Sequence, residues 1–166
     1  MGSSAAAAIA TVAEPSADTM SAPPLRVLIV DDSRAQRRML SASLRRTGYH
    51  IDEAASGEEA LAYCEANPVD LILSDWMMPG MSGVEFCQAF RQLGQDNYGY
   101  FILLTSKSER DDIAAGLDAG ADDFLTKPVN GTELAARIKA GARIVDMQHE
   151  LTGKNKVIAA TLEELQ

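Results

Sequence analysis

Five short segments alternate with stretches of helical periodicity from residue 25 onward. They are residues 25–30, 51–54, 70–74, 100–104 and 123–126, and most of their side chains are apolar. Short apolar runs between turn residues are consistent with strands buried in a parallel sheet. The alternation of strands and helices therefore predicts the α/β class, with a doubly wound, five-stranded parallel sheet.

The stretches between these segments carry helix start and stop signals. The first helix begins after a polar cap at residues 31–33 and ends at Gly48, and we expect Ala35, Met39 and Ala42 on its buried face. Similar signals place the other helices at residues 57–66, 82–93, 109–119 and from 131 onward.

Four of the five predicted strands lead into a residue that could bind a phosphate or the cation beside it. These residues are Asp31 and Asp32 after the first, Asp75 after the third, Thr105 after the fourth and Lys127 after the fifth. In an open parallel sheet the ligand site lies outside the carboxyl ends of the strands. We therefore expect all five side chains in one crevice.

Three carboxylates in one crevice repel one another unless a proton or a cation offsets their charge. A set of oxygen ligands favours Mg²⁺, which keeps coordination positions open for phosphate oxygens. Lys127 and Thr105 would bind further phosphate oxygens by charge and by hydrogen bonding. The pattern predicts a magnesium-dependent site for a phosphoryl group.

Four sequence blocks resemble the receiver domain of two-component response regulators. They are Val-Leu-Ile-Val-Asp-Asp-Ser (27–33), Leu-Ile-Leu-Ser-Asp-Trp-Met-Met-Pro-Gly-Met-Ser-Gly (71–83), Ile-Leu-Leu-Thr-Ser (102–106) and Gly-Ala-Asp-Asp-Phe-Leu-Thr-Lys-Pro (120–128). The resemblance covers roughly residues 25–145. It implies a flavodoxin-like strand order, 2-1-3-4-5, and a signalling switch rather than an enzyme.

The resemblance also implies a role for each site residue. Asp75 would accept a phosphoryl group from a histidine kinase or a histidine phosphotransfer protein, with Lys127 as the phosphate partner. Asp32 would bind Mg²⁺ directly and Asp31 through water, and Asp75 and the Met77 carbonyl would complete the metal site. Thr105 and Phe124 would form the switch pair that changes the face made by the fourth helix, fifth strand and fifth helix.

Other interpretations of these residues are weaker. Each acid, Thr105 and Lys127 could serve a local cap or turn, but independent caps have no reason to fall at four strand ends. An aspartate-nucleophile phosphohydrolase is the alternative function; it would need an Asp-x-Asp pair, whereas Met77 stands two places after Asp75. A flavodoxin-like cofactor binder would need a first loop rich in Gly, Ser or Thr.

Composition excludes some function classes. A chain of 166 residues, 46% of them hydrophobic, has the length of one domain with an ample core. A formal net charge of −9 argues against a nucleic-acid surface. Residues 1–24 contain no Lys or Arg and no stretch that could span a membrane, so we expect a disordered leader. Cys64 and Cys87 match no metal or redox spacing and are expected as reduced, buried thiols of a cytoplasmic protein.

Residues 146–166 are expected to continue the last helix as a linker or coiled-coil extension. Ile144, Leu151, Ile158 and Leu165 recur every seven residues, and Gln148, Asn155 and Leu162 complete two seams. The pattern predicts a homodimer, with a helix folded on its own domain or a frayed linker as the alternatives. Receivers with such helices resemble those joined to diguanylate cyclase or serine/threonine phosphatase output domains.

Three further residues carry simpler expectations. Trp76 is expected to be a half-exposed aromatic residue beside Asp75, and His50 and His149 are expected at the surface.

Overall fold

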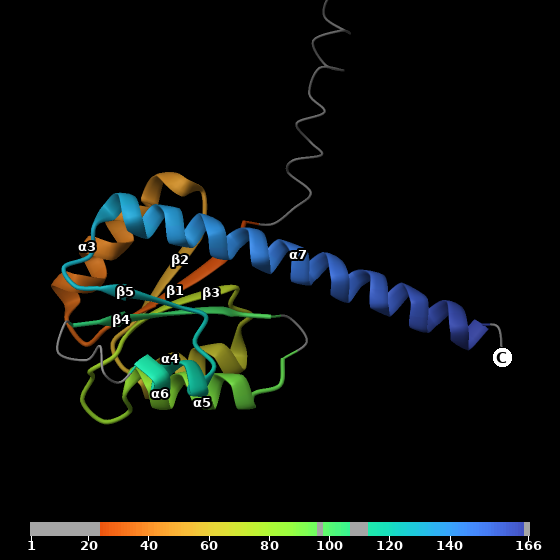
Figure 1. Ribbon diagram of the computed structural model, residues 1–166, viewed down its shortest axis with the longest axis horizontal. Coiled ribbons are helices and arrows are strands. Elements are labelled where there is room, and N and C mark those ends of the chain that lie inside the picture. Colours follow the sequence, from red (N-terminus) through yellow and green to blue (C-terminus); the bar gives the residue numbers. More distant parts are fainter. Residues whose placement is uncertain (1–23, 96–97, 107–112, 165–166) are drawn as a thin grey trace, which may run out of the picture.

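A five-stranded parallel sheet forms the centre of the protein (Figure 1). The computed structural model describes residues 24–95, 98–106 and 113–164, without the side chains of residues 155 and 156. The strands are β1 (Arg26–Val30), β2 (His50–Ala54), β3 (Leu71–Asp75), β4 (Tyr100–Thr105) and β5 (Asp123–Thr126). Their order is β2-β1-β3-β4-β5 and all neighbours are parallel, so the predicted topology is confirmed.

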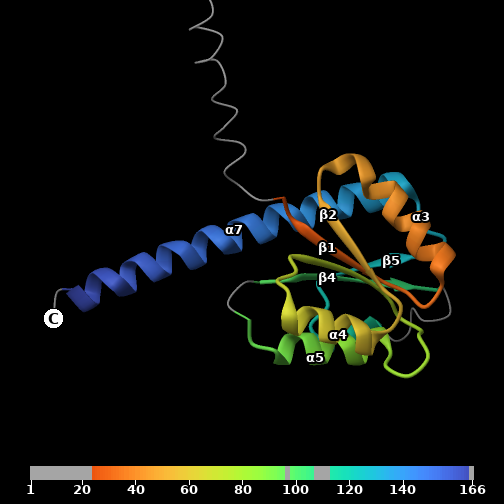
Figure 2. The same cartoon turned by 180° about the vertical axis from the view of Figure 1, so that it is seen from behind.

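Helices cover both faces of the sheet (Figures 1 and 2). Helices α4 (Gly57–Ala66), α5 (Gly83–Gln92) and α6 (Ile113–Ala119) cover one face, while α3 (Arg34–Leu44) and α7 (Gly131–Glu164) cover the other; η1 (Arg45–Thr47) follows α3. Every residue of β3 and β4 is buried because these strands lie between two helical layers. The expected start of α6 at residue 109 lies outside the described residues.

Helix α3 buries a different face from the one expected. Leu40 and Leu44 are buried, whereas Met39 is 54% exposed and Ala35 and Ala42 also face solvent. The helix sequence offers two apolar stripes, and the two leucines together remove more apolar surface from water than the alanines and Met39 would. The expectation for Ala35, Met39 and Ala42 is therefore wrong.

Arg91 fastens the amino ends of β4 and β5 to α5. Its guanidinium donates to the Gly120 carbonyl from Nε at 3.0 Å and to the Gly99 carbonyl from Nη1 at 2.6 Å. It also pairs with Asp122 at 2.7 Å, and the Asp122 carboxylate accepts a bond from the Phe101 N–H. Charge-assisted hydrogen bonds of this kind are short and strong, so they stabilise the packing of α5 against the amino ends of β4 and β5.

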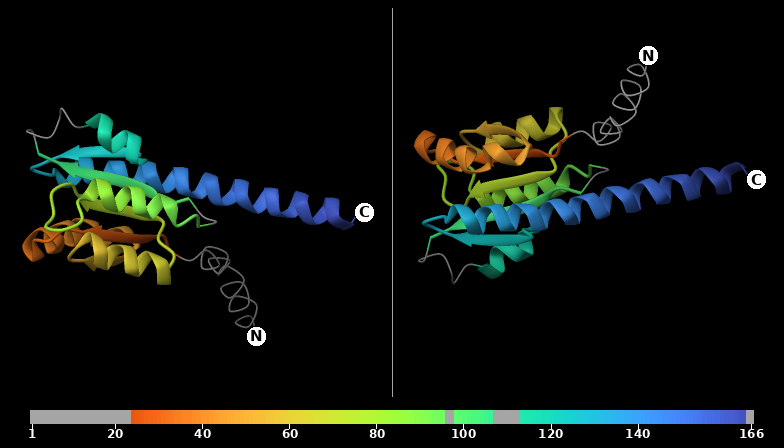
Figure 3. Two further views of the ribbon diagram at one scale, coloured as in Figure 1. Left: turned by 90° about the horizontal axis from the view of Figure 1, so that it is seen from below. Right: turned by 90° about the horizontal axis from the view of Figure 1, so that it is seen from above.

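Helix α7 is 34 residues long and runs past the sheet and its other helices (Figure 3). Asn130 caps its start, since its side-chain oxygen accepts from the Thr132 and Glu133 N–H groups. The first half of α7 buries Leu134, Ile138, Ala142 and Val145 against the sheet. Of the helices in the described ranges, not even α7 is apolar enough over sufficient length to cross a bilayer.

The buried face of α3 predicts that substitutions at two neighbouring residues lower the free energy of unfolding by different amounts. Leu40→Ala should lower the free energy of unfolding by about 2–5 kcal/mol, because it leaves a cavity at a residue that is 2% exposed. Met39→Ala should change it by no more than about 0.5 kcal/mol, since Met39 already faces water. Urea unfolding of both variants measures the difference, and a larger loss for Met39→Ala would contradict this packing.

Candidate phosphoryl-acceptor site

The carboxyl ends of the strands bring the predicted acids together. Asp31 and Asp32 follow β1, and Asp75 is the last residue of β3. One carboxylate oxygen from each lies within 4.8 Å of the others. The Lys127 ammonium, just beyond β5, is 2.7 Å from Asp75 Oδ1. The crevice thus brings three carboxylates together with the Lys127 ammonium.

Asp31 is the most buried of the three acids, with 1% of its surface exposed. Its Oδ1 accepts a bond from the Ser33 N–H at 2.9 Å, whereas its buried Oδ2 has no hydrogen-bond partner among the described residues. Burial raises the pKa of Asp31, an effect opposed by the Ser33 bond and increased by the Asp75 charge. Asp32, by contrast, is exposed at the rim.

Asp75 combines burial with a strong cationic contact. Burial raises its pKa, while the hydrogen bond and charge of Lys127 oppose the rise. Its main-chain carbonyl lies against Gly83, where a Cβ would come within 2.2 Å of that oxygen. A larger residue at Gly83 would therefore push β3 or α5 out of place.

The loop from β3 to α5 is held at both ends by hydrogen bonds. The Gly83 N–H donates to the Trp76 carbonyl at 2.8 Å, and the Met81 N–H donates to Glu58 Oε1 at 2.8 Å. Hydrogen bonds from its own and the Met81 backbone lower the pKa of Glu58. Met77 lies in this loop with its side chain exposed.

Sequence reasoning missed both Glu58 and Gly83. An acid in the first turn of a helix is common because it complements the helix dipole, so Glu58 gave no signal of a contact 23 residues away. Gly83 follows the capping residue Ser82. The sequence shows that the residue is small, but it does not show that the Asp75 carbonyl lies against it.

Thr105 and Phe124 lie on the neighbouring strands β4 and β5. Thr105 is buried, and its carbonyl accepts a bond from the Lys127 N–H at 2.7 Å. Phe124 is half-buried, with its ring centroid 6.3 Å from that of Trp76. A Cβ on Gly116 would lie 2.8 Å from the Phe124 ring, so the ring uses the space that this glycine leaves.

Trp76 is buried, with 7% of its surface exposed, so the expectation of a half-exposed ring is wrong. It belongs to the core cluster on the α4–α5–α6 side of the sheet, against which Phe124 also packs. Strand alternation places Trp76 on the same face of the sheet as Ile72, and the helices on that face cover its ring.

The donor set fits a hard divalent cation. Asp31 Oδ2 is a buried oxygen without a hydrogen-bond partner in the described part of the chain, and the neighbouring acids add oxygens of the type that Mg²⁺ prefers. A bound cation would offset the charges whose burial raises the pKa of Asp31 and Asp75.

The cysteines and His50 lie outside this crevice. Cys64 and Cys87 are free and buried, and burial raises their pKa values to about 12 and about 11, which suppresses thiolate chemistry. His50 is exposed as expected, with Nε2 3.0 Å from Asp52 Oδ2.

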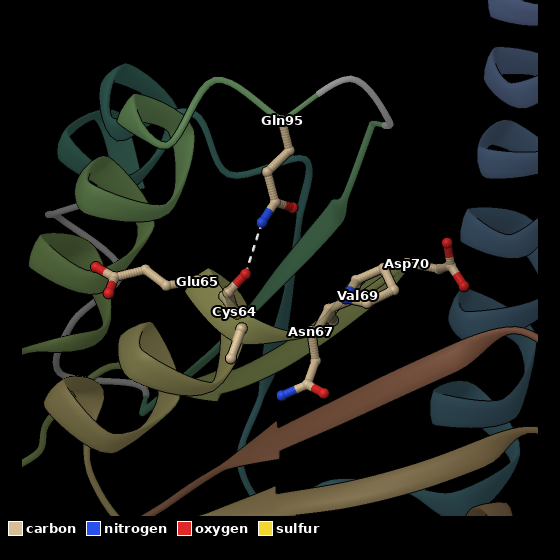
Figure 4. A pocket seen from close by; sticks show the side chains of 8 residues that line it. Cys64, Glu65, Asn67, Val69, Asp70 and Gln95 are labelled. Atoms are coloured by element: carbon tan, nitrogen blue, oxygen red, sulfur yellow. Dashed lines mark hydrogen bonds between the residues drawn. The ribbon is translucent and has the colours of Figure 1, made fainter.

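A separate hollow of about 240 Å³ opens near the amino end of β3 (Figure 4). Residues 64–70 and Gln95 line it, and the Gln95 side chain donates to the Cys64 carbonyl at 2.6 Å. It is at the opposite end of β3 from Asp75. The bond from Gln95 links the loop after α5 to α4, a structural role.

The buried acids predict that Mg²⁺ stabilises the fold in a pH-dependent way. Because the pKa values of Asp31 and Asp75 are raised, the metal-free fold should lose stability as pH rises from the ordinary value of 3.8 through the raised values. At neutral pH, Mg²⁺ at about 100 times its Kd should add about 2.7 kcal/mol. Thermal unfolding at several pH values measures this.

Asp31→Asn tests the same point. This variant removes a buried charge, so its Tm without Mg²⁺ should rise and its response to Mg²⁺ should shrink. Asp118→Asn, on the exposed side of α6, is the matched control and should respond like the unmodified chain. An equal Mg²⁺ response in Asp31→Asn and the control would contradict the metal site.

Comparison with known proteins identifies the family of this chain. Residues 27–139 match the family model of the response regulator receiver domain. The response regulator MprA of Mycobacterium sp. (strain KMS) is 43% identical over 117 residues, which are 70% of this chain and 50% of that protein. The chain therefore spans about half the length of such curated relatives.

Solved structures are also similar. The chemotaxis response regulator CheY4 of Vibrio cholerae is 36% identical with a TM-score of 0.67, and the match covers 71% of this chain and 98% of that one. A probable two-component response regulator/GGDEF domain protein is 32% identical with a TM-score of 0.69, covering 74% of this chain and 50% of that one. This chain belongs to the response regulator receiver family of two-component signalling.

Proposed function

We propose that this chain is a phosphorylation switch whose acceptor is Asp75. The observation that carries the proposal is the 2.7 Å contact between Lys127 Nζ and Asp75 Oδ1, beside two further carboxylates at the same edge of the sheet. A nucleophilic carboxylate with an adjacent ammonium and a candidate cation site has the parts needed for phosphoryl transfer.

The transfer forms one bond and breaks another. An oxygen of the Asp75 carboxylate attacks phosphorus in line and forms the acyl phosphate. With a phosphohistidine donor the phosphorus–nitrogen bond breaks, its electron pair stays on the imidazole, and that nitrogen takes a proton. Lys127 offsets negative charge on the transferring group.

The proposed cofactor is Mg²⁺. Asp32 would hold it directly, Asp31 through water, and Asp75 and the Met77 carbonyl would complete the protein ligands. When bound, the ion neutralises charge on the phosphoryl oxygens. The chain itself supplies the nucleophile Asp75, the charge of Lys127 and the positioning of the donor.

Phosphorylation is proposed to act through Thr105 and Phe124. The Thr105 hydroxyl moves toward the acyl phosphate, and Phe124 turns into the space that it leaves. The Phe124 ring packs near Trp76 and fills the space that Gly116 leaves on α6. Its movement would therefore alter the surface made by α6, β5 and α7.

The proposed donor is a histidine kinase or a histidine phosphotransfer protein. Supporting this, α3 begins just after Asp31 and Asp32 and exposes Met39, Arg34 and Arg38. Apolar and basic side chains on one helix beside the acids suit a partner surface that is partly apolar and partly acidic. The two reduced, buried cysteines agree with a cytoplasmic location.

The proposed output is a catalytic domain of the diguanylate cyclase type joined to α7. One similar solved structure is named a response regulator/GGDEF domain protein, and it extends well beyond the matched part. The serine/threonine phosphatase type, the other expectation, has no counterpart among the structures named above. The phosphohydrolase alternative is weaker, because the residue two places after Asp75 is Met77, whose side chain carries no acid.

Intact mass spectrometry tests the acceptor. With acetyl phosphate and Mg²⁺, the mass should rise by one phosphoryl group that hydroxylamine removes, because an acyl phosphate is labile to that nucleophile. Asp75→Asn should gain nothing, whereas the matched Asp118→Asn should behave like the unmodified chain. A hydroxylamine-labile adduct of equal yield in Asp75→Asn would refute the assignment.

Tryptophan emission tests the switch, since Trp76 is the only tryptophan of the chain. Adding a beryllofluoride mimic of the phosphate to the Mg²⁺-bound protein should change the emission, because Phe124 contacts Trp76. Thr105→Val should lose most of that change. Thr126→Val, at the paired position on β5, should keep it. Equal responses in the two variants would mean that the Thr105 hydroxyl plays no part.

A further inference from the structure

The second half of α7 carries an exposed apolar stripe. The described part of the chain has eight large hydrophobic side chains classed as exposed, and five of them lie on this helix. These five are Met147, Leu151, Val157, Ile158 and Leu162, each more than half exposed. A stripe of this size on an otherwise polar helix marks a contact surface.

The stripe faces away from the receiver that carries it. Successive residues of an α-helix are about 100° apart around its axis. Leu151 is therefore about 120° around the helix from the buried Val145. By the same count, Ile158 is about 160° from the buried Ile138. Because α7 is one continuous helix, its own receiver cannot cover the stripe.

Near the middle of α7, a side chain still contacts the body of the receiver. His149 Nε2 lies 3.5 Å from Asp70 Oδ1, and the same carboxylate accepts a bond from the Arg26 N–H at 2.9 Å. His149 is half-buried rather than a plain surface residue, which corrects that expectation. Ile144 also packs against the receiver core, so it is not part of a free seam, contrary to the expected heptads.

We propose that α7 pairs in parallel with α7 of a second copy of this chain as a short coiled coil. Leu151 and Ile158 occupy a positions, Met147 and Lys154 occupy d positions, and the flanking g and e positions hold Val157 and Leu162. This register uses all five exposed apolar side chains. The register expected from sequence put Asn155 at an a position and leaves Val157 in water; Leu165 and the Asn155 side chain lie outside the description.

A shallow hollow on the surface of α7 is consistent with this register. Lys154, Val157 and Ile158 line a shallow hollow together with Glu150 and Gly153. In a coiled coil each a side chain enters a hole formed by four residues of the facing helix. Three sides of the hole for the partner's Ile158 are thus already present. The Lys154 ammonium reaches Glu150 at 3.3 Å and stays at the rim, while its stem covers the seam.

The charges of the helix favour a second copy over a lipid surface. Helices that lie on membranes carry Lys and Arg on their polar face. Here the exposed polar side chains include Glu150, Glu163 and Glu164. A seven-residue spacing from Leu151 to Ile158 instead matches a left-handed pair of identical helices, which share one pitch.

This pairing leaves both acceptor sites free. Helix α7 begins beyond the carboxyl end of β5 and contacts Asp70 at the amino end of β3, so the coiled coil leaves the molecule opposite Asp75 (Figure 1). Two receivers can therefore be phosphorylated while paired.

Sedimentation equilibrium of the full 166-residue chain tests the pairing. The chain should be a dimer, and Leu151→Glu with Ile158→Glu should weaken dimerisation at least tenfold. Ala160→Glu, which is on the opposite side of the helix from Leu151, should remain dimeric. A monomeric unmodified chain at every concentration, a larger assembly, or equal loss in Ala160→Glu would overturn the proposal.

Cysteine crosslinking tests the orientation. Leu151→Cys and Ile158→Cys should each give a crosslinked dimer under mild oxidation, whereas Ala160→Cys should not; the native Cys64 and Cys87 are buried and should not interfere. A dimer that crosslinks at neither position would overturn the parallel arrangement. Both experiments use unphosphorylated protein and can be repeated in Asp75→Asn, so their failure is distinct from failure of the acceptor assignment.

Discussion

The cost of burying negative charge at one edge of the sheet governs this structure. Asp31 and Asp75 have raised pKa values because water is largely excluded from their carboxylates. The Lys127 contact offsets part of that cost, and none of the residues that the structure describes forms a hydrogen bond with Asp31 Oδ2. A site arranged in this way favours a bound cation. The cation in turn favours a negatively charged group such as a phosphoryl group.

The two ends of the sheet divide structural and chemical work. At the amino end, Arg91 and Asp122 connect helix, strands and loop through several short bonds. At the carboxyl end, the Asp31, Asp75 and Lys127 side chains face the crevice. A tightly bonded amino end gives the carboxyl end a fixed frame, so the shifts proposed for Thr105 and Phe124 would reach the surface rather than be absorbed by the core.

Sequence was sufficient for the topology and for the proximity of the acids, because apolar strands and their polar ends follow simple periodicities. It was insufficient where two packing solutions compete or where partners are distant. The stripe of Leu40 and Leu44 and the stripe of Met39 are both helical, and only the assembled layers decide between them. Glu58 reaches Met81 across 23 residues, and Trp76 is buried by elements that no local pattern names.

A continuous helix such as α7 can act as a lever. From His149, which contacts Asp70, to Glu164 the helix extends about 22 Å at about 1.5 Å per residue. A tilt of about 5° at that point would move the far end by about 2 Å, comparable to the helix shifts that switch other proteins. The contact between His149 and Asp70, 3.5 Å apart, lies at the near end of this segment, so its geometry would set how far a tilt of the helix moves the far end.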